Sequence, residues 1–367
     1  MTAFATVEEF RTALRDWLDT HDLSPGPDHS LDAQVAQLGR VRKALFDAGW
    51  MRHGWPAGVR GLGGPAVFRA VLGEEVATRG LAEPGIYSMV EVLVPTLIAY
   101  APPELAADMV PLLLNGDEQW CQGFSEPGSG SDLASLTTRA VLQDDGTWRV
   151  NGQKVWTSLA QYAARCVLLT RTAPGHDGIT AFFVDMDTQG ITVRPLRTMH
   201  GVDEFAEVFF DDVVVPADRM LGRPGDGWRL AMDLLPHERS TCFWHRVAHL
   251  YTRLDRLLEE TSEPEDAALG AAYLALHTVR CRSHATQRRL AEGARLGPET
   301  SVDKVLLATA EQCLFDTARD LLPGVLELTD SPWRSEYLYS RAATIYGGTA
   351  EIQRNIIARR LLDLGKE

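Results

Sequence analysis

The chain has 367 residues, of which 45% are hydrophobic and 23% charged, and its formal net charge at pH 7 is −14. This balance is typical of a globular protein with room for two or three domains and a substantial core. The acidic excess and the lack of any run of five basic residues exclude a general nucleic-acid or anionic-membrane surface, because both need clustered Lys and Arg.

Cysteine usage and the first residues indicate the compartment. Five scattered cysteines without a CxxC pair fit reduced thiols better than a disulfide framework. We expect each to be a small buried residue, and we predict no metal site. Residues 1–19 lack the apolar segment of a signal peptide, and no apolar run is long enough to span a bilayer. The prediction is therefore a cytoplasmic protein.

The first third of the chain is predicted to be helical. Apolar residues recur at helical spacing within residues 7–18 and 38–46, and residues 67–76 and 84–100 are further candidate helices. Residues 54–65 are rich in glycine and are predicted to be a loop. A phosphate-binding loop is disfavoured there, because no strand-like run precedes it and no Gly-Lys-Ser/Thr ends it.

From about residue 119 the pattern changes to short β-rich runs. Residues 148–150 and 154–156 flank Asn151-Gly152, a dipeptide typical of a tight hairpin turn. The other candidate strands are residues 167–170, 179–184, 191–193 and 208–215. Together they predict an antiparallel barrel or sandwich, followed by a loop at residues 222–227.

After Trp228 the helical pattern returns almost to the end. The candidate helices are residues 247–258, 267–290, 301–322 and 337–362, with long interruptions at residues 292–301 and 322–333. The order helical, β, helical predicts three domains, which we place at residues 1–117, 118–225 and 226–367.

Residues 121–132, Cys-Gln-Gly-Phe-Ser-Glu-Pro-Gly-Ser-Gly-Ser-Asp, are the most informative segment. A loop of such small residues is not expected to pack a core. Because glycine lacks a Cβ, its backbone N–H groups and the Ser hydroxyls can approach a planar polar ligand. Residues 151–158 add a tryptophan and two hydroxyls about twenty residues later.

These segments, in this order, resemble the acyl-CoA dehydrogenase family. The loop resembles its T-E-P-x-A-G-S-D motif, and the second segment resembles its N-G-x-K-x-W-I-T strand. Three further matches are residues 206–216 and 222–228, which resemble the end of its β-domain, and residues 345–359 (IYGGTAEIQRNIIAR), which resemble its C-terminal signature. The resemblance implies an α+β fold with an N-terminal α-helical domain, a middle antiparallel β-barrel and a C-terminal four-helix bundle, carrying FAD.

The resemblance also assigns cofactor roles. Ser125 would hydrogen-bond the flavin ring, Ser131 would lie between cofactor and substrate, and Ser158 would bond near N5. Trp156 would cover one face of the ring, since an indole is a flat apolar wall. The structural alternative is a core tryptophan with surface serines. The other positions assigned to the cofactor in these two segments are Phe124, Gly130 and Thr157.

The C-terminal signature supplies two more predicted contacts. Thr349 and Glu351 match positions that contact the adenine-side half of FAD in relatives, where glutamine is common at the second position. Thr349 is also a candidate N-cap of a helix, with Ile352, Ile356 and Ile357 on its packed face. The two roles of Thr349 are compatible.

The implied reaction removes an α-proton from an acyl thioester, so a carboxylate must lie against the α-carbon. Many relatives carry it in Tyr-Glu-Gly-Thr, but residues 346–349 here are Tyr-Gly-Gly-Thr. Relatives acting on long, branched or ring-bearing chains carry it in L-P-x-E-R, which residues 235–239 match. Glu238 is therefore the predicted base. The alternative is a carboxylate in the first turn of a helix that starts at Pro236, stabilised by the helix dipole.

The oxyanion partner implied by the resemblance is the backbone N–H of Gly347 together with a ribityl hydroxyl of FAD. His200 and His237 are expected to be structural. Many homotetrameric relatives bind the FAD pyrophosphate through an R-x-x-F-G motif and a Q-x-x-G-G-x-G-F loop. This chain has Arg280, Arg282 and Arg288 without Phe-Gly, and residues 322–324 stand in place of the loop. The distal half of the FAD site therefore departs from the family pattern.

The predicted function is FAD-dependent α,β-dehydrogenation of an acyl thioester, carried on CoA or on a carrier protein. The expected partners are an electron-transfer flavoprotein or another acceptor, and further subunits in a homo- or hetero-oligomer, dimer or tetramer. Some bacterial relatives, including steroid side-chain enzymes, pair two unlike chains and share cofactor sites. Two alternatives stay open: an oxidase or flavin monooxygenase on the same scaffold, and a non-catalytic partner subunit.

Overall fold

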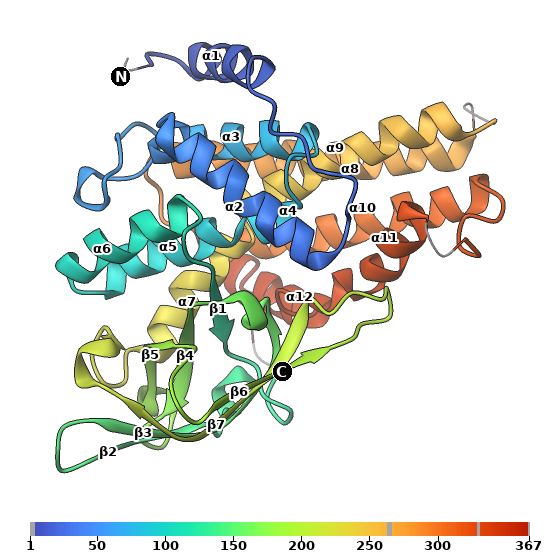
Figure 1. Ribbon diagram of the computed structural model, residues 1–367. Coiled ribbons are helices and arrows are strands. Elements are labelled where there is room, and N and C mark those ends of the chain that lie inside the picture. Colours follow the sequence, from blue (N-terminus) through green and yellow to red (C-terminus); the bar gives the residue numbers. More distant parts are fainter. Residues whose placement is uncertain (1–3, 263–265, 329–330, 366–367) are drawn as a thin grey trace.

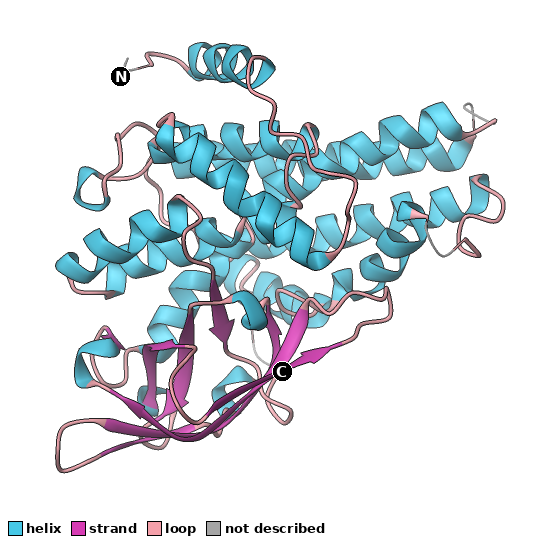
Figure 2. Cartoon of the chain, in the orientation of Figure 1, coloured by secondary structure: helices cyan, strands magenta, loops and turns pink. Residues whose placement is uncertain are grey.

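A computed structural model describes residues 4–262, 266–328 and 331–365. Helices of the two ends of the chain stack together, and the strands form a layer at one end of the molecule (Figure 1 and Figure 2). The predicted order of an N-terminal helical part, a middle sheet and a C-terminal helical part is confirmed.

Six helices form the N-terminal part: α1 (Val7–Asp19), α2 (Leu31–Asp47), α3 (Val67–Thr78), α4 (Pro84–Tyr87), α5 (Met89–Tyr100) and α6 (Pro103–Leu114). The predicted helix over residues 84–100 is broken at Ser88 into α4 and α5. Helix α6 was not predicted from the sequence; it has Pro103 at its first turn, where no N–H is needed, and Pro111 inside it. Residues 54–65 contain one short 3-10 turn (Ala57–Val59) and otherwise form the predicted loop.

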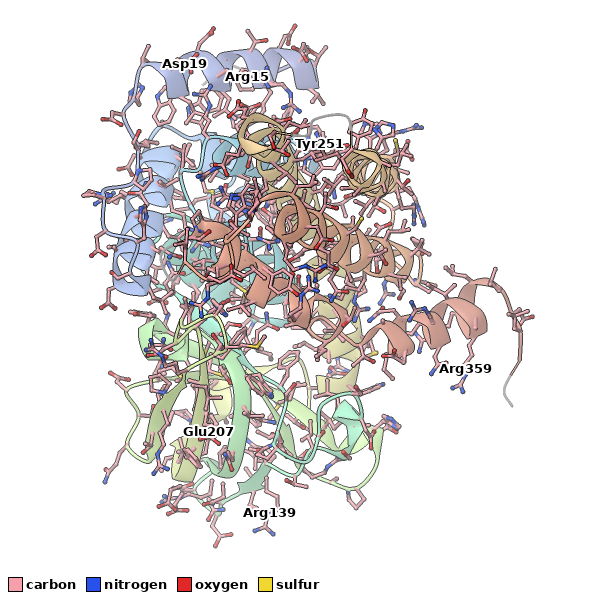
Figure 3. All side chains as sticks on the ribbon, turned by 90° about the vertical axis from the view of Figure 1, so that its right-hand side faces the viewer. Arg15, Asp19, Arg139, Glu207, Tyr251 and Arg359 are labelled. Carbon is pink, nitrogen blue, oxygen red and sulfur yellow. The ribbon has the colours of Figure 1, made fainter. Side chains whose placement is uncertain are left out.

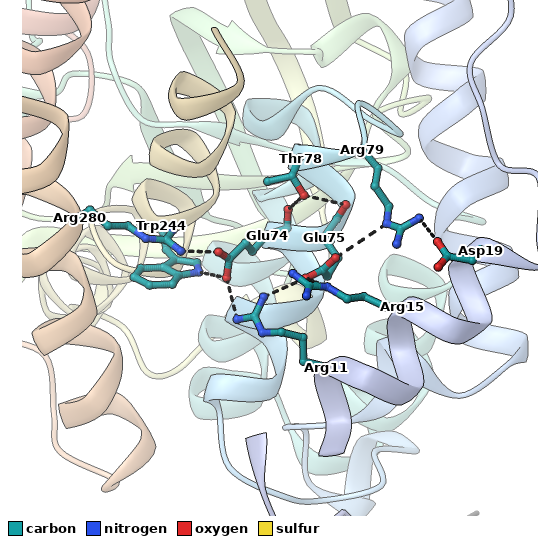
Figure 4. A network of polar contacts seen from close by, with 9 residues as sticks. All are labelled: Arg11, Arg15, Asp19, Glu74, Glu75, Thr78, Arg79, Trp244 and Arg280. Carbon is teal, nitrogen blue, oxygen red and sulfur yellow. Dashed lines mark hydrogen bonds and ion pairs between the residues drawn. The ribbon is translucent and has the colours of Figure 1, made fainter. Parts of the chain in front are cut away.

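A polar network fastens α1 and α3 to the C-terminal helices (Figure 4). Glu74 of α3 accepts hydrogen bonds from Arg11 of α1 (3.0 Å) and from the indole N–H of Trp244 (3.2 Å), and it pairs with Arg280. Burial raises the pKa of Glu74, but the charges of Arg280 and Arg11 outweigh burial, and the net effect lowers the pKa below its ordinary value. Glu75 pairs with Arg11 (2.8 Å) and with neighbouring arginines.

Eight strands form the middle sheet: β1 (Trp120–Gly123), β2 (Arg139–Leu142), β3 (Trp148–Ser158), β4 (Arg165–Arg171), β5 (Ile179–Asp185), β6 (Ile191–Leu196), β7 (Phe205–Val215) and β8 (Met220–Leu221). The order is β6-β7-β3-β2-β4-β5-β8, and β1 pairs with β4. Most pairs are antiparallel as predicted, but β1 and β2 both run parallel to β4. In the described part of the chain β6 and β8 do not pair, so hydrogen bonds do not close this sheet into the predicted barrel.

The predicted hairpin turn at Asn151-Gly152 is wrong. Both residues lie inside β3, where the register with β7 shifts between Val150 and Gly152. The Asn151 side chain accepts a hydrogen bond from the N–H of Asp212 (2.9 Å), so the dipeptide forms a bulge rather than a turn. The turn between β2 and β3 lies at residues 143–147, where Gly146 has a φ of 84°.

The C-terminal part contains α7 (Gly227–Glu238), α8 (Thr241–Glu260), α9 (Ala267–Ala291), α10 (Thr300–Leu321), α11 (Pro332–Ser340) and α12 (Ala350–Ile356). Helices α8, α9 and α10 pack on one another, and α11 and α12 both pack on α10. The end of α11, a 3-10 turn (Arg341–Thr344), α12 and a π-helical turn (Ile357–Leu361) take the place of the predicted continuous helix over residues 337–362. The break falls at residues 345–349, where Gly347 and Gly348 have φ values of 62° and 90°.

Candidate active site

A buried ion pair holds the loop that follows β1 against β3. The Lys154 ammonium donates to a carboxylate oxygen of Glu126 (2.8 Å) and to the carbonyl oxygen of Phe124 (3.1 Å). The other donors to Glu126 are the backbone N–H groups of Thr137 and Thr138 and the Thr137 hydroxyl. The carboxylate therefore sits in a dense set of donors.

The surroundings of this ion pair shift the pKa values of both Glu126 and Lys154. Burial raises the pKa of Glu126, but the Lys154 charge and the hydrogen-bond donors outweigh burial, and the pKa falls to about 2. Burial lowers the pKa of Lys154. Both groups lie in the motifs singled out in the sequence, yet neither was predicted as a site residue.

The loop packs more tightly than predicted. Glu126 and Ser129 exchange two backbone hydrogen bonds (2.8 and 3.0 Å), which close a turn over residues 126–129. Both side chains are buried, and the Ser129 hydroxyl donates to the carbonyl oxygen of Asp132 (2.7 Å). The expectation that this loop packs no core is wrong for these two residues. Gly130 and Ser131 are exposed, and a side chain at Gly130 would meet nothing within 4 Å.

Ser125 and the end of β3 are neighbours, as predicted. The Val155 N–H donates to the carbonyl oxygen of Ser125 (2.9 Å). Trp156 has a φ of 59°, which is rare for a bulky residue, and its side chain is 61% exposed. An exposed indole held in a costly backbone conformation indicates a surface that a ligand covers, and it excludes the alternative of a core tryptophan.

The other predicted residues of this half lie around the same strand. Ser158 is half-buried at the end of β3, and Phe124 is buried beneath the loop. Thr157 is completely buried, and its hydroxyl has no hydrogen-bond partner within the described ranges. The flat indole, the open Gly130 and the half-buried hydroxyls of Ser125 and Ser158 fit a planar ring with polar edges. These residues could hold the flavin half of FAD.

Glu238 lies at the last position of α7, not in a first turn. Pro236 is inside the helix, so the alternative of a carboxylate held by a helix N-terminus is wrong. The carboxylate is half-buried, and in the described part of the chain it forms no hydrogen bond or ion pair. A Cβ added to Gly347 would lie 3.0 Å from its Oε1 atom. Glu238 and residue 347, the two positions at which relatives carry the base, therefore lie next to each other in space.

The peptide group that follows the Gly347 α-carbon is fixed by hydrogen bonds to its carbonyl oxygen. Arg239 donates to the Gly347 carbonyl oxygen from Nε (3.0 Å), and Gln353 donates to the same oxygen from its side-chain amide (3.2 Å). Among the described residues the Gly347 N–H donates no hydrogen bond. The unpaired N–H of Gly347 therefore lies beside the unpaired carboxylate of Glu238. Arg239 and Gln353, which hold the adjoining peptide group, were not predicted as site residues.

Lys304 of α10 is a further buried charge next to this loop. Its ammonium donates to the Ala343 carbonyl oxygen (2.7 Å) and lies 3.8 Å from the centre of the Tyr346 ring. Burial lowers the pKa of Lys304 to about 8, although Glu238 and Glu311 act in the opposite direction. Sequence reasoning missed this residue, because it belongs to none of the motifs.

Thr349 is the N-cap of α12, as expected, and its hydroxyl accepts from the Ile352 N–H (3.3 Å). The packed face of α12 differs from the prediction, because Gln353 is completely buried while Ile352 and Ile356 are only half-buried. Glu351 is exposed and lies 4.0 Å from Arg354.

The predicted departures at the distal half of the FAD site have a structural counterpart. Arg280 pairs with Glu74, and Arg282 pairs with Asp303 (3.0 Å), so internal carboxylates engage two of the three arginines considered for the pyrophosphate. Arg288 is exposed.

The two histidines occupy structural settings. His200 exchanges a hydrogen bond with Thr198 (2.8 Å), and burial lowers the pKa of His237 to about 4. The cysteines are all free, but the expectation of burial is wrong for Cys281, which is exposed. Over residues 4–262, 266–328 and 331–365, no group of three or more His, Cys, Asp or Glu could hold a metal ion. No helix in these ranges is both long and apolar enough to cross a membrane.

Comparisons with known proteins find similarity along nearly the whole chain. Residues 121–213 match the acyl-CoA dehydrogenase middle domain, and residues 225–362 match the acyl-CoA dehydrogenase C-terminal domain. The acyl-CoA dehydrogenase IpdE1 of Mycobacterium tuberculosis is 37% identical, and the match covers 98% of both chains. Two solved structures align over nearly the whole chain with a TM-score of 0.83. One is the ChsE4-ChsE5 complex of the same organism (27% identity; 100% of each chain), and the other is a variant of the steroid ACAD Tcur3481-Tcur3483 (25%; 98% and 99%).

Proposed function

The chain belongs to the acyl-CoA dehydrogenase family, and we propose that Glu238 is the base of its reaction. The protein is an oxidoreductase that uses FAD and acts on an acyl-CoA. The observation that carries the proposal is the unpaired Glu238 carboxylate, whose Oε1 lies 3.0 Å from the Cβ position of residue 347. A general base needs a carboxylate that is within reach of the proton and is not already engaged by a cation.

The chain's own residues divide the work of proton removal. Glu238 takes the α-proton, and negative charge then develops on the thioester oxygen. The free N–H of Gly347 donates a hydrogen bond to that oxygen, and Arg239 and Gln353 hold the adjoining Gly347–Gly348 peptide group in place. When bound, FAD supplies the acceptor for the hydrogen that leaves the β-carbon. Because the donor is fixed before the reaction, it needs no reorganisation when charge develops.

We assign the flavin half of the cofactor site to the loop after β1 and the end of β3. Trp156 covers one face of the ring, and Ser125 and Ser158 hydrogen-bond its edge. The remaining residues assigned to this half are Phe124, Gly130, Ser131 and Thr157. Thr349 and Glu351 are assigned to the adenine half. The exposed indole and the open space at Gly130 support the assignments of the flavin half, and those of Thr349 and Glu351 follow from the family resemblance.

We also propose that a related but unlike chain completes the distal half. Internal carboxylates engage Arg280 and Arg282, which leaves them poorly suited to a pyrophosphate. The C-terminal segment that carries Arg359 extends away from the rest of the chain (Figure 3) and exposes Leu361, Leu362 and Leu364. Exposed apolar side chains at a projecting end favour burial against another subunit. Two of the similar solved structures are named after a pair of chains.

We propose that the substrate is an acyl-CoA with a bulky or ring-bearing acyl group and that the electron acceptor is an electron-transfer flavoprotein. The L-P-x-E-R placement of the base and the similarity to a steroid ACAD support the acyl group. The acceptor rests on the family resemblance alone.

The deciding experiment follows flavin bleaching without oxygen. The FAD-loaded protein, with its partner chain where one is needed, is mixed with butyryl-, octanoyl- and cyclohexanecarboxyl-CoA. At least one should bleach the flavin, and Glu238→Gln should slow that bleaching at least a thousandfold while FAD stays bound. Glu104→Gln, which changes an exposed carboxylate on α6, should bleach normally. Persistent bleaching in Glu238→Gln would remove Glu238 from its role and favour a partner subunit as the source of the base.

A further inference from the structure

Lys304 places a buried positive charge behind the proposed base without touching it. The Cε atom of Lys304 lies 3.7 Å from the Cβ position of residue 347, and Oε1 of Glu238 lies 3.0 Å from the same point. Yet no salt bridge joins the two side chains within the described ranges. The ammonium instead donates to the Ala343 carbonyl oxygen and faces the Tyr346 ring.

This arrangement has a chemical consequence. A direct ion pair would occupy a carboxylate oxygen that must receive a proton, and it would weaken the carboxylate as a base. A cation that forms no ion pair with the carboxylate leaves both oxygens free, and its charge still acts on the site because Coulomb attraction falls slowly with distance in a dry interior. Lys304 is 1% exposed, so water screens its charge only weakly.

Lys304 also holds the segment that presents the oxyanion donor. Its hydrogen bond to Ala343 and its position over the Tyr346 ring fix the chain just before Gly347. Tyr346 is held in turn from its far end, since its hydroxyl donates to Glu311 (3.3 Å). Lys304 therefore contacts the segment that precedes Gly347, and it also lies close to Glu238.

We propose that Lys304 is a positioning residue that holds the Tyr346-Gly347 peptide, which carries the oxyanion donor, in place beside Glu238. The inference rests on the proposed role of Glu238. A positioning role would explain why Lys304 is buried although burying a cation costs free energy.

The other charges around Lys304 come from three elements. Glu238 and Arg239 lie at the end of α7, Glu311 lies about two turns farther along α10, and Tyr346 lies in the loop after α11. The Glu311 carboxylate is engaged by Arg246 (2.8 Å), and Arg239 is engaged by the Gly347 carbonyl oxygen. Glu238 is therefore the free anion in this set.

The test compares Lys304→Met with Lys304→Arg in the FAD-loaded protein, using the acyl-CoA that bleaches the wild type fastest. The rate is measured from pH 6 to pH 9. In Lys304→Met we expect the rate to fall about tenfold at pH 7, because the segment that presents the Gly347 N–H loses its anchor. The two curves should converge above pH 8, since wild-type Lys304 loses its own charge near that pH. Lys304→Arg should keep most of the wild-type profile.

Asp303→Asn is the matched control, because it removes a neighbouring buried charge from α10 that pairs with Arg282. We expect it to lower thermal stability and to leave the pH profile in place. A Lys304→Met protein with the wild-type profile, or one slowed equally at every pH, overturns the inference. If the flavin of Glu238→Gln is still bleached, Glu238 is not the base. If Glu238→Gln is not bleached but Lys304→Met behaves like the wild type, Glu238 remains the proposed base and only the proposed role of Lys304 is wrong.

Discussion

The carboxylate of Glu238 and the α-carbon of Gly347 occupy adjoining space, although the two residues lie far apart in the sequence. A side chain at position 347 would begin 3.0 Å from Oε1 of Glu238, which is closer than most Cβ atoms approach an oxygen. The base on α7 and a side chain in the loop before α12 therefore compete for one place. The glycine is what leaves room for the carboxylate.

The first prediction concerns this crowding. Gly347→Ala should slow flavin bleaching by an acyl-CoA at least tenfold, because its methyl group displaces the Glu238 carboxylate. It should also cost about 1 kcal/mol of stability, since the residue has a φ of 62°. Gly293→Ala is the control: its φ is 77°, and a side chain there meets nothing within 4 Å. It should show the stability cost with normal bleaching. Equal bleaching by both variants would contradict the crowding.

The second prediction concerns the ion pair under the flavin loop. Glu126→Gln leaves Lys154 as an unpaired buried cation and should reduce the free energy of unfolding by about 3 kcal/mol at pH 7, with loss of bound FAD. The pKa of Glu126 is lowered from 4.5 to about 2 in the folded protein, so its contribution is present above pH 4.5 and disappears as pH falls towards 2. The difference between wild type and variant in urea unfolding should shrink over that range.

Glu207→Gln serves as the control for this measurement, because Glu207 is a half-buried carboxylate of β7 in the same sheet. It should change the unfolding free energy by less than about 1 kcal/mol. A Glu126→Gln protein as stable as this control at pH 7 would show that the pair does not hold the loop.

The third prediction concerns Trp156. Replacing it with Gly should weaken FAD binding at least tenfold, measured by titration of the apoprotein with flavin fluorescence, because the flat wall is lost. The stability of the apoprotein should change by less than about 1 kcal/mol, since glycine relieves the backbone cost at a φ of 59°. Leu142→Ala, an exposed apolar residue of β2, should leave FAD affinity unchanged. Unaltered affinity in Trp156→Gly would exclude the indole as the wall of the flavin site.

The fourth prediction concerns the network of Figure 4. Glu74→Gln removes the negative charge that Arg11, Trp244 and Arg280 share and replaces one acceptor oxygen with a donor, and it should cost about 2–4 kcal/mol at pH 7. Because the folded state lowers the pKa of Glu74, this contribution is lost on acidification and the variant should then approach the wild type. Glu104→Gln, on the exposed face of α6, should match wild type in chemical denaturation throughout. A Glu74→Gln protein that also matches it would show that the network adds no stability.

The sequence by itself determined the order of the domains, the family, the cofactor and the two candidate positions of the base. These follow from local properties: helical and strand periodicity, and motifs in which the chemistry needs particular residue types at fixed spacing. It failed where a local pattern has two structural solutions. Asn151-Gly152 can form a turn or a bulge, and only pairing with β7 decides between them. The continuous apolar pattern over residues 337–362 concealed the break at Gly347 and Gly348.

Only the tertiary structure decided which groups surround the base. Lys304 lies on a different helix from Glu238 and belongs to no motif, so no local pattern connects it to Gly347. Gln353 lies in the C-terminal signature, but nothing local shows that its side chain turns back to the Gly347 carbonyl oxygen. Their roles depend on burial and on distances between segments far apart in the chain. The same holds for the freedom of the Glu238 carboxylate, because only the packed structure specifies which cations reach it and which are engaged elsewhere.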